Sequence, residues 1–279
     1  MRFTGELDVA IHTQQLTIAY SETLGDPAKT PILYLPGWGC TKEDIAGAEM
    51  NEDLADRRII SFDYPGYGDS PPPAEHPFPF NQWSYLGLVK TIHRRLDMGR
   101  TAVVGHSAAG ADAIYFASFC KEYAAGLVSV MGNLGPADCF ITGQLAGMTA
   151  QEVLHGGFDG YVLKLAQSKN PGMKRYVEQI SNFDRAAILN YRNHGLSVVQ
   201  HCELGNLLPR FLDYDGPKLF VHGEDEQTVY LDSLRAAPVP IATIEGAGHF
   251  PFVDKPAAYF KVLGDFMVQL DDGLRSQHA

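Results

Sequence analysis

The sequence lacks a block of basic residues and any long apolar run. Of its 279 residues, 22 are Lys or Arg and 33 are Asp or Glu, so the formal net charge is −11. Binding to nucleic-acid phosphates needs a basic patch, so no nucleic-acid partner is expected. No apolar stretch approaches the ~20 residues that cross a membrane, and the N-terminus has no apolar core of a signal peptide. We therefore expect a cytoplasmic protein that does not bind membranes.

Cysteine is also scarce, and metal and nucleotide motifs are absent. The four cysteines are scattered and form no CxxC pair, so we expect reduced thiols in or near the core. The histidines show no HExxH spacing, and no Gly-rich phosphate loop is present. From the sequence we expect neither a metal nor a cofactor. Hydrophobic residues make up 45% of the chain, enough to bury a sizeable core.

Short apolar runs alternate with helix-length segments along most of the chain. Helices are expected over 82–97, 108–123 and 256–270. The later runs are apolar almost throughout, as in strands that are covered on both faces. This alternation predicts an α/β fold with a mostly parallel sheet. The first two runs could pair antiparallel at one edge. The runs that predict strands are 15–20, 31–35, 58–62, 101–105, 127–131, 218–222 and 240–245.

One segment breaks this alternation. Residues 137–213 contain helical patterns separated by Gly and Pro, with no convincing strand. An insertion of this length between core strands is typical of a cap over a binding site, although it could simply pack on the core. We expect a core made of residues 1–136 and 214–279, with residues 137–213 as a helical cap.

The stretch VVGHSAAG, residues 103–110, predicts a strand that turns directly into a helix. Such a turn strains the residue at its tip and needs small residues two before and two after it, here Gly105 and Ala109. Ser107 would then present its hydroxyl above the sheet, at a helix N-terminus that favours an oxyanion. Alternatively, Ser107 only caps the helix.

Two further loops supply the partners that a nucleophilic serine needs. His249 lies in the Gly-rich stretch IEGAGHFPFVDKP, after the last predicted strand, where it could serve as the base. The loop PGWGC follows the run 31–35 and could offer the backbone N–H of Trp38 to an oxyanion. The N–H of Ala108 would be the second donor. The plainer interpretation of PGWGC is an ordinary turn.

Five motifs together resemble the α/β-hydrolase fold, in its cap-bearing esterase and lactonase branch. The resemblance implies an eight-stranded, mostly parallel sheet and a triad in the order serine, acid, histidine. It also implies that Asp63 and Asp69 have structural roles. Pro36 departs from the pattern, since relatives usually carry histidine there. The motifs are LPGWG (35–39), FDYPGYGDS (62–70), VVGHSAAG (103–110), VHGEDEQTV (221–229) and EGAGHFPFVDKP (245–256).

The acid of the triad has more than one candidate position. The resemblance places it three residues past Gly223, at Glu226, with the adjacent Asp225 as the alternative. A solvated acidic turn is the plainer interpretation of residues 224–226. Other members of the fold carry the acid after the strand that follows the nucleophile. Met131 stands there in this chain, and the nearest carboxylate is Asp138.

These features predict a serine hydrolase that cleaves a carboxylic ester or lactone of a small, largely apolar substrate. Trp38, Met131, Phe140 and Tyr191 are the predicted substrate contacts. The same triad can hydrolyse carbon–carbon bonds or carry out perhydrolysis, and the fold also hosts ligand-binding proteins with little turnover. For the assembly, a homodimer is the alternative to a monomer.

Overall fold

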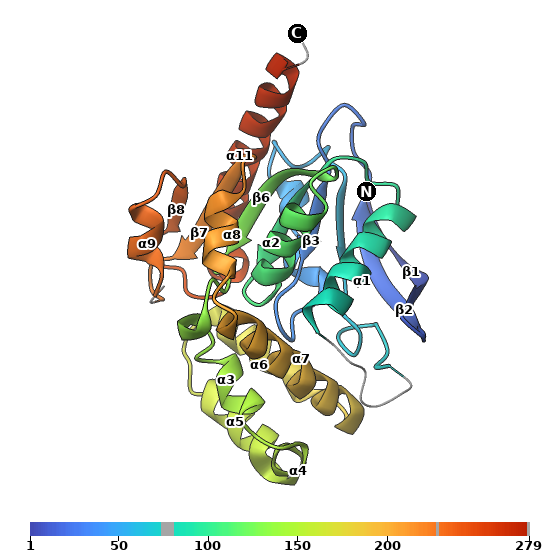
Figure 1. Ribbon diagram of the computed structural model, residues 1–279, viewed down its shortest axis with the longest axis vertical. Coiled ribbons are helices and arrows are strands. Elements are labelled where there is room, and N and C mark those ends of the chain that lie inside the picture. The colour runs from blue at the N-terminus through green and yellow to red at the C-terminus, as the bar shows by residue number, and fades with distance from the viewer. Residues whose placement is uncertain (74–80, 227–228, 278–279) are drawn as a thin grey trace.

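The computed structural model describes residues 1–73, 81–226 and 229–277. Its centre is one eight-stranded sheet in the order β1-β2-β4-β3-β5-β6-β7-β8 (Figure 1). Every pairing from β4 to β8 is parallel, whereas β2 is antiparallel to both β1 and β4. The mostly parallel sheet is therefore confirmed. Its strands are β1 (Arg2–Ile11), β2 (Gln14–Thr23), β3 (Ile32–Leu35), β4 (Ile59–Phe62), β5 (Thr101–His106), β6 (Ala124–Val130), β7 (Lys218–Gly223) and β8 (Ile241–Ile244).

The suggested pairing of the first two runs is wrong. β2 contains the run 15–20, and it pairs with β1 and β4, while β3 lies between β4 and β5. All four residues of β3 are buried, as in a central strand that is covered on both faces. β1 can take the edge because its residues are mostly exposed or half-buried.

Helices cover both faces of the sheet. α1 (Gln82–Arg95) and α2 (Ala109–Phe119) lie on one face, and α11 (Pro256–Gln277) lies on the other (Figure 1). α1 begins where the side chain of Asn81 accepts hydrogen bonds from the first free N–H groups of the helix. None of the described helices combines the length and apolarity needed to cross a bilayer. The short elements η1 (Lys42–Ile45), η2 (Ala48–Met50), α9 (Leu231–Arg235) and α10 (Pro251–Asp254) complete this part.

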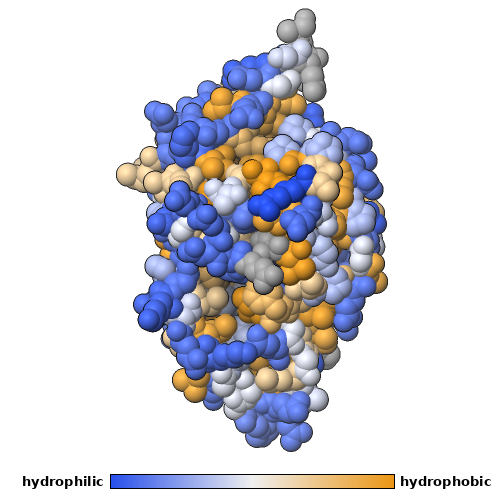
Figure 2. Space-filling view, turned by 90° about the vertical axis from the view of Figure 1, so that its left-hand side faces the viewer, coloured by the Kyte–Doolittle hydropathy of each residue, from blue (hydrophilic) through white to orange (hydrophobic). Residues whose placement is uncertain are grey.

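All residues from 137 to 213 are described, and none of them lies in a strand. Most of these helices lie together beyond one end of the sheet, whereas α8 packs beside α2 (Figure 1). The outer surface at this lower end of the molecule is mainly hydrophilic (Figure 2). That these helices form a cap over a site stays a prediction. The elements are η3 (Pro136–Asp138), α3 (Thr142–Ala146), α4 (Ala150–Glu152), η4 (Val153–Gly157), α5 (Phe158–Leu165), α6 (Pro171–Ser181), α7 (Arg185–Glu203) and α8 (Leu207–Asp213).

Candidate active site

Ser107 lies at the sharp turn between β5 and α2. Its φ is 52°, in the left-handed region that a residue with a side chain seldom adopts. The turn is held by a hydrogen bond of 2.8 Å from its N–H to the carbonyl of Val130, and its own carbonyl accepts from Gly110 and Asn133. The strand therefore places Ser107 at the C-terminal ends of the parallel strands.

Small neighbours are a steric requirement of this turn. A Cβ atom on Gly105 would lie 2.3 Å from the carbonyl oxygen of Ala109, and one on Gly110 would lie 2.7 Å from the Cα of Gly132. Both distances are far inside van der Waals contact. The close approach of strand and helix therefore requires glycine at position 105, where the sequence pattern predicted a small residue, and Gly110 allows the close approach of Gly132.

The structure brings Ser107, His249 and Glu226 into one hydrogen-bonded chain. Nε2 of His249 is 2.8 Å from Oγ of Ser107, and Nδ1 is 2.8 Å from Oε1 of Glu226. Only 12% of the His249 side chain and 18% of the Glu226 side chain are exposed. A carboxylate can only accept, so Nδ1 carries a proton and Nε2 is left free to accept the proton of the serine.

Glu226 also sets the charge state of His249. Burial by itself lowers the pKa of this imidazole, but the nearby charge of Glu226 and its hydrogen bond outweigh that effect and raise the pKa above its usual value. An elevated pKa favours the imidazolium that forms when a base accepts a proton. The same contact therefore orients the ring and stabilises its protonated form.

Neither of the other carboxylates considered from the sequence makes a hydrogen bond to His249 within the described residues. Asp225 is exposed, and its backbone N–H donates to Ala247. Asp138 accepts a hydrogen bond of 2.7 Å from the N–H of Leu134. Met131 is buried, with its sulfur 3.0 Å from the N–H of Gly223. It thus supports the end of β7, just before the turn that carries Glu226.

Of the two predicted oxyanion donors, Ala108 directly follows Ser107, and Trp38 lines the same cavity as Ser107. Within the described residues, no hydrogen bond uses the N–H of Trp38 or that of Ala108. The Trp38 indole donates to the carbonyl of Tyr191 at 2.7 Å, and its ring stacks on the Tyr191 ring. These contacts therefore hold the loop against helix α7. Pro36 stands where the resemblance leads us to expect a histidine. The role of these two N–H groups as oxyanion donors stays a prediction.

Sequence and structure comparisons place the chain in a family. Residues 32–262 match the model of the alpha/beta hydrolase family. The chain belongs to this family. No curated protein matches it in sequence.

Solved structures of hydrolases share the fold of this alpha/beta hydrolase. A thermophilic esterase from Thermogutta terrifontis has a TM-score of 0.75 at 16% identity, with 96% of this chain and 99% of that chain covered. A carboxylesterase structure from Nitrososphaera gargenis gives 0.77 at 11% identity, with 96% and 100% covered. The enol-lactonase from Burkholderia xenovorans LB400 gives 0.72 at 15% identity, with 94% and 100% covered. At these identities the likeness establishes the fold alone.

A narrow cavity opens above the serine of this hydrolase-family chain. Its free volume is about 20 Å³, roughly the space of one or two water molecules. Trp38 and Phe140, two of the predicted substrate contacts, line it together with Ser107 and His249. The remaining lining residues are Cys40, His106, Asn133, Asp138, Ile141, Thr142, Tyr176 and Phe250.

The structure does not bring the other two predicted contacts to this cavity. Met131 is turned toward Gly223, and Tyr191 lies behind the indole of Trp38 with no exposed surface. Cys40 and Asn133 were missed as lining residues, although Cys40 ends the PGWGC loop that was considered for the oxyanion donors. Phe250 could have been found, since it directly follows His249.

Proposed function

We propose that this protein is a serine hydrolase that cleaves carboxylic ester or lactone bonds of small, largely apolar substrates. The observation that carries this proposal is the continuous contact from Ser107 through His249 to Glu226, with 2.8 Å at each hydrogen bond. A serine whose hydroxyl contacts an oriented imidazole has the arrangement of an activated nucleophile.

In the first half of the proposed reaction, Ser107 Oγ attacks the carbonyl carbon and transfers its proton to Nε2 of His249. The carbonyl oxygen becomes an oxyanion, to which the N–H groups of Trp38 and Ala108 donate. As the tetrahedral intermediate collapses, the ester C–O bond breaks. His249 gives the proton to the oxygen of the departing alcohol. The acyl group remains bonded to Ser107 Oγ.

Water completes the cycle in the second half. His249 takes a proton from the water as its oxygen attacks the acyl carbon, and the same two N–H groups hold the second oxyanion. Ser107 Oγ then leaves and recovers its proton from His249, so that the carboxylic acid is released. Glu226 holds the imidazole in one tautomer throughout both halves.

The cavity supports a small acyl group. Its volume of about 20 Å³ has no room for a long chain in this arrangement, and Trp38, Phe140 and Phe250 give it an aromatic wall. Esters of short acids, such as acetate, fit the site better than octanoates. Larger substrates require Phe140, which is 48% exposed, or its neighbours to move.

The direct test is labelling of the intact protein with a fluorophosphonate, measured by mass spectrometry. We expect one label per chain in the wild type and none in Ser107→Ala. Ser118→Ala is the matched control, since that serine lies on α2, the helix that follows Ser107, and donates to the Ile114 carbonyl. Turnover of acetate, butyrate and octanoate esters and of a small lactone is then compared to rank the substrates.

Two outcomes would contradict the proposal. Folded wild-type protein that takes up no label would mean that Ser107 is not activated, and would favour a binding protein with little turnover. Labelling that persists in Ser107→Ala would place the nucleophile elsewhere in the chain.

A further inference from the structure

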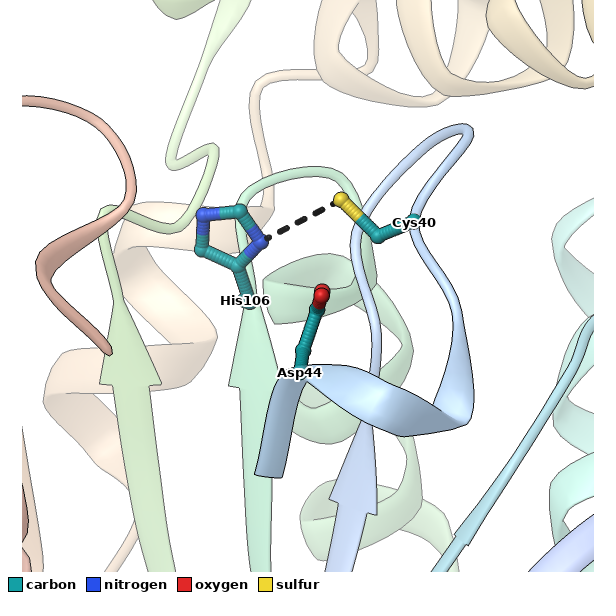
Figure 3. Close-up of side chains that lie close together, drawn as sticks. All are labelled: Cys40, Asp44 and His106. Atoms are coloured by element: carbon teal, nitrogen blue, oxygen red, sulfur yellow. Dashed lines mark hydrogen bonds between the residues drawn. The ribbon is translucent and has the colours of Figure 1, made fainter. Parts of the chain in front are cut away.

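A second cluster of reactive side chains lies behind Ser107. Cys40 belongs to the loop after β3, Asp44 to η1, and His106 to the end of β5 (Figure 3). Their ligand atoms all lie within 4.8 Å of one another, and Cys40 Sγ is 4.0 Å from Nδ1 of His106. All three residues are buried, and the carboxylate of Asp44 points between the other two side chains.

The His106 ring presents an unprotonated nitrogen to this cluster. Its Nε2 lies 2.8 Å from the backbone carbonyl of His249. A carbonyl oxygen can only accept a hydrogen bond, so the proton is on Nε2 and the lone pair is on Nδ1. Histidines that bind metals usually have their second nitrogen fixed by such a contact. The ring is therefore already oriented as a ligand.

Asp44 brings a buried carboxylate to the cluster. Its Oδ1 pairs with Arg175 at 3.2 Å, and its side chain also interacts with the Cys40 thiol and with Gln179. By geometry alone, Oδ2 has no hydrogen-bond partner within the described residues. The hydroxyls of Tyr34 and Tyr259 are also buried without hydrogen bonds. Burying a polar atom without a hydrogen-bond partner lowers the stability of the fold. A ligand bound among these side chains would remove that loss.

We propose that Cys40, Asp44 and His106 bind one divalent metal ion, with zinc as the best match to the ligands. Thiolate, imidazole and carboxylate are the three donor types of zinc sites, whereas magnesium and calcium prefer oxygen alone. Tetrahedral zinc bonds to sulfur and nitrogen place those two atoms about 3.6 Å apart. The separation of 4.0 Å in this structure needs only a small side-chain movement.

The site joins three parts of the chain that surround the nucleophile. Cys40 lies two residues after the oxyanion donor Trp38, and His106 directly precedes Ser107. A bound ion would therefore clamp the oxyanion loop to the end of β5, without contact to the reacting atoms. Cys40 and His106 also line the cavity above Ser107, which gives the ion an access path. His106 is far from Cys40 and Asp44 in the sequence, so no local spacing motif announces the complete set of ligands.

The test is a titration of metal-free protein with Co²⁺, followed by its absorption spectrum. We expect one equivalent to give tetrahedral d–d bands and a thiolate-to-cobalt charge-transfer band, both lost when Zn²⁺ displaces the cobalt. Cys40→Ser and Asp44→Asn should weaken cobalt affinity at least about 100-fold, since even indirect partners of metal ligands contribute 10- to 100-fold. Cys120→Ser is the matched control, because this buried thiol lies at the end of α2.

X-ray absorption of zinc-loaded wild-type protein tests the proposal without relying on variants that fold. One sulfur among the zinc ligands is expected. Two sulfurs would instead indicate binding at Cys139 and Cys202, whose thiols lie next to each other. That result would overturn the assignment. Failure of the folded wild type to take up either metal, or unchanged affinity in Cys40→Ser, would also overturn it.

Discussion

Trp38 and Tyr191 stack face to face, with ring centroids 3.8 Å apart and planes 6° from parallel. Trp38 belongs to the loop after β3, and Tyr191 belongs to α7 in the helical region beyond the sheet. The Trp38 indole also donates to the Tyr191 carbonyl. The proposed oxyanion loop is thus positioned by a helix that lies about 150 residues further along the chain.

Replacing the Tyr191 ring should lower turnover by more than the accompanying loss of stability explains. We expect Tyr191→Leu to lower kcat about tenfold or more, because the Trp38 N–H is displaced from the oxyanion. Tyr191→Phe keeps the stack and loses only hydroxyl contacts with Tyr161 and Tyr176, at about 1 kcal/mol of stability each. Ester turnover and thermal unfolding of both variants check this. Equal turnover in the two variants would show that the stack does not position the loop.

The identity of the acid can be tested at two adjacent positions. Glu226→Gln should reduce kcat by about 10³- to 10⁴-fold, because an amide can donate to Nδ1 and favour the wrong tautomer. Asp225→Asn is the matched control and should retain wild-type turnover, since that side chain is exposed. Steady-state kinetics on one short-chain ester measure both. The reverse ranking would assign the role to Asp225.

The charge of Glu226 should also appear in the pH profile. Burial lowers the pKa of His249, but the charge and hydrogen bond of Glu226 raise it above 6.5 overall. Only neutral His249 can accept a proton, so kcat/KM should rise with pH through this elevated pKa. The stabilising effect on folding has the opposite sign: it is present in full below about pH 6.5 and lost as pH rises through the folded-state pKa.

The acid limb of the kcat/KM profile measures this shift. In Glu226→Gln the limb should move to lower pH, because the largest cause that raises the pKa is gone. Asp225→Asn should leave it in place. A limb that is the same in all three proteins would mean that it reports another group.

Backbone strain at Ser107 gives a prediction about stability. Its φ of 52° is unfavourable for any residue with a Cβ atom, by about 1–2 kcal/mol. Ser107→Gly and Ser107→Ala lose the same hydroxyl, and only glycine relieves the strain. We expect Ser107→Gly to be the more stable of the two by about 1 kcal/mol. Urea unfolding of both variants measures the difference. A more stable Ser107→Ala would indicate that the turn is not strained.

Asp138 should select against negatively charged substrates. It lines the cavity above Ser107, and burial raises its pKa to about 6, so its carboxylate is charged at pH 8. We expect Asp138→Asn to raise kcat/KM about tenfold for an ester whose acyl group carries a carboxylate. A neutral ester of the same size is the control and should change little. An equal effect on both esters would rule out a charge-based role.

Local patterns were sufficient for Ser107 and His249. The sharp turn at Ser107 needs small residues close by in sequence, and the His249 loop directly follows a strand. Both could therefore be predicted from neighbouring residues. Glu226 and Asp225 could not be separated in this way. They are adjacent, and the path of the turn after β7 decides which carboxylate meets the imidazole. Met131 and Tyr191 were predicted as cavity residues from their apolar character, which does not reveal the direction of a side chain.

The sequence by itself determined the alternation of strands and helices, the helical insertion and the residues of the sharp turn, because these depend on the periodicity and size of neighbouring side chains. Only the tertiary structure decided the place of β3 between β4 and β5, the stack of Trp38 on Tyr191, and the meeting of Cys40, Asp44 and His106. These contacts join segments that are distant along the chain. Their geometry depends on how the whole sheet and its helices pack, which no local pattern encodes.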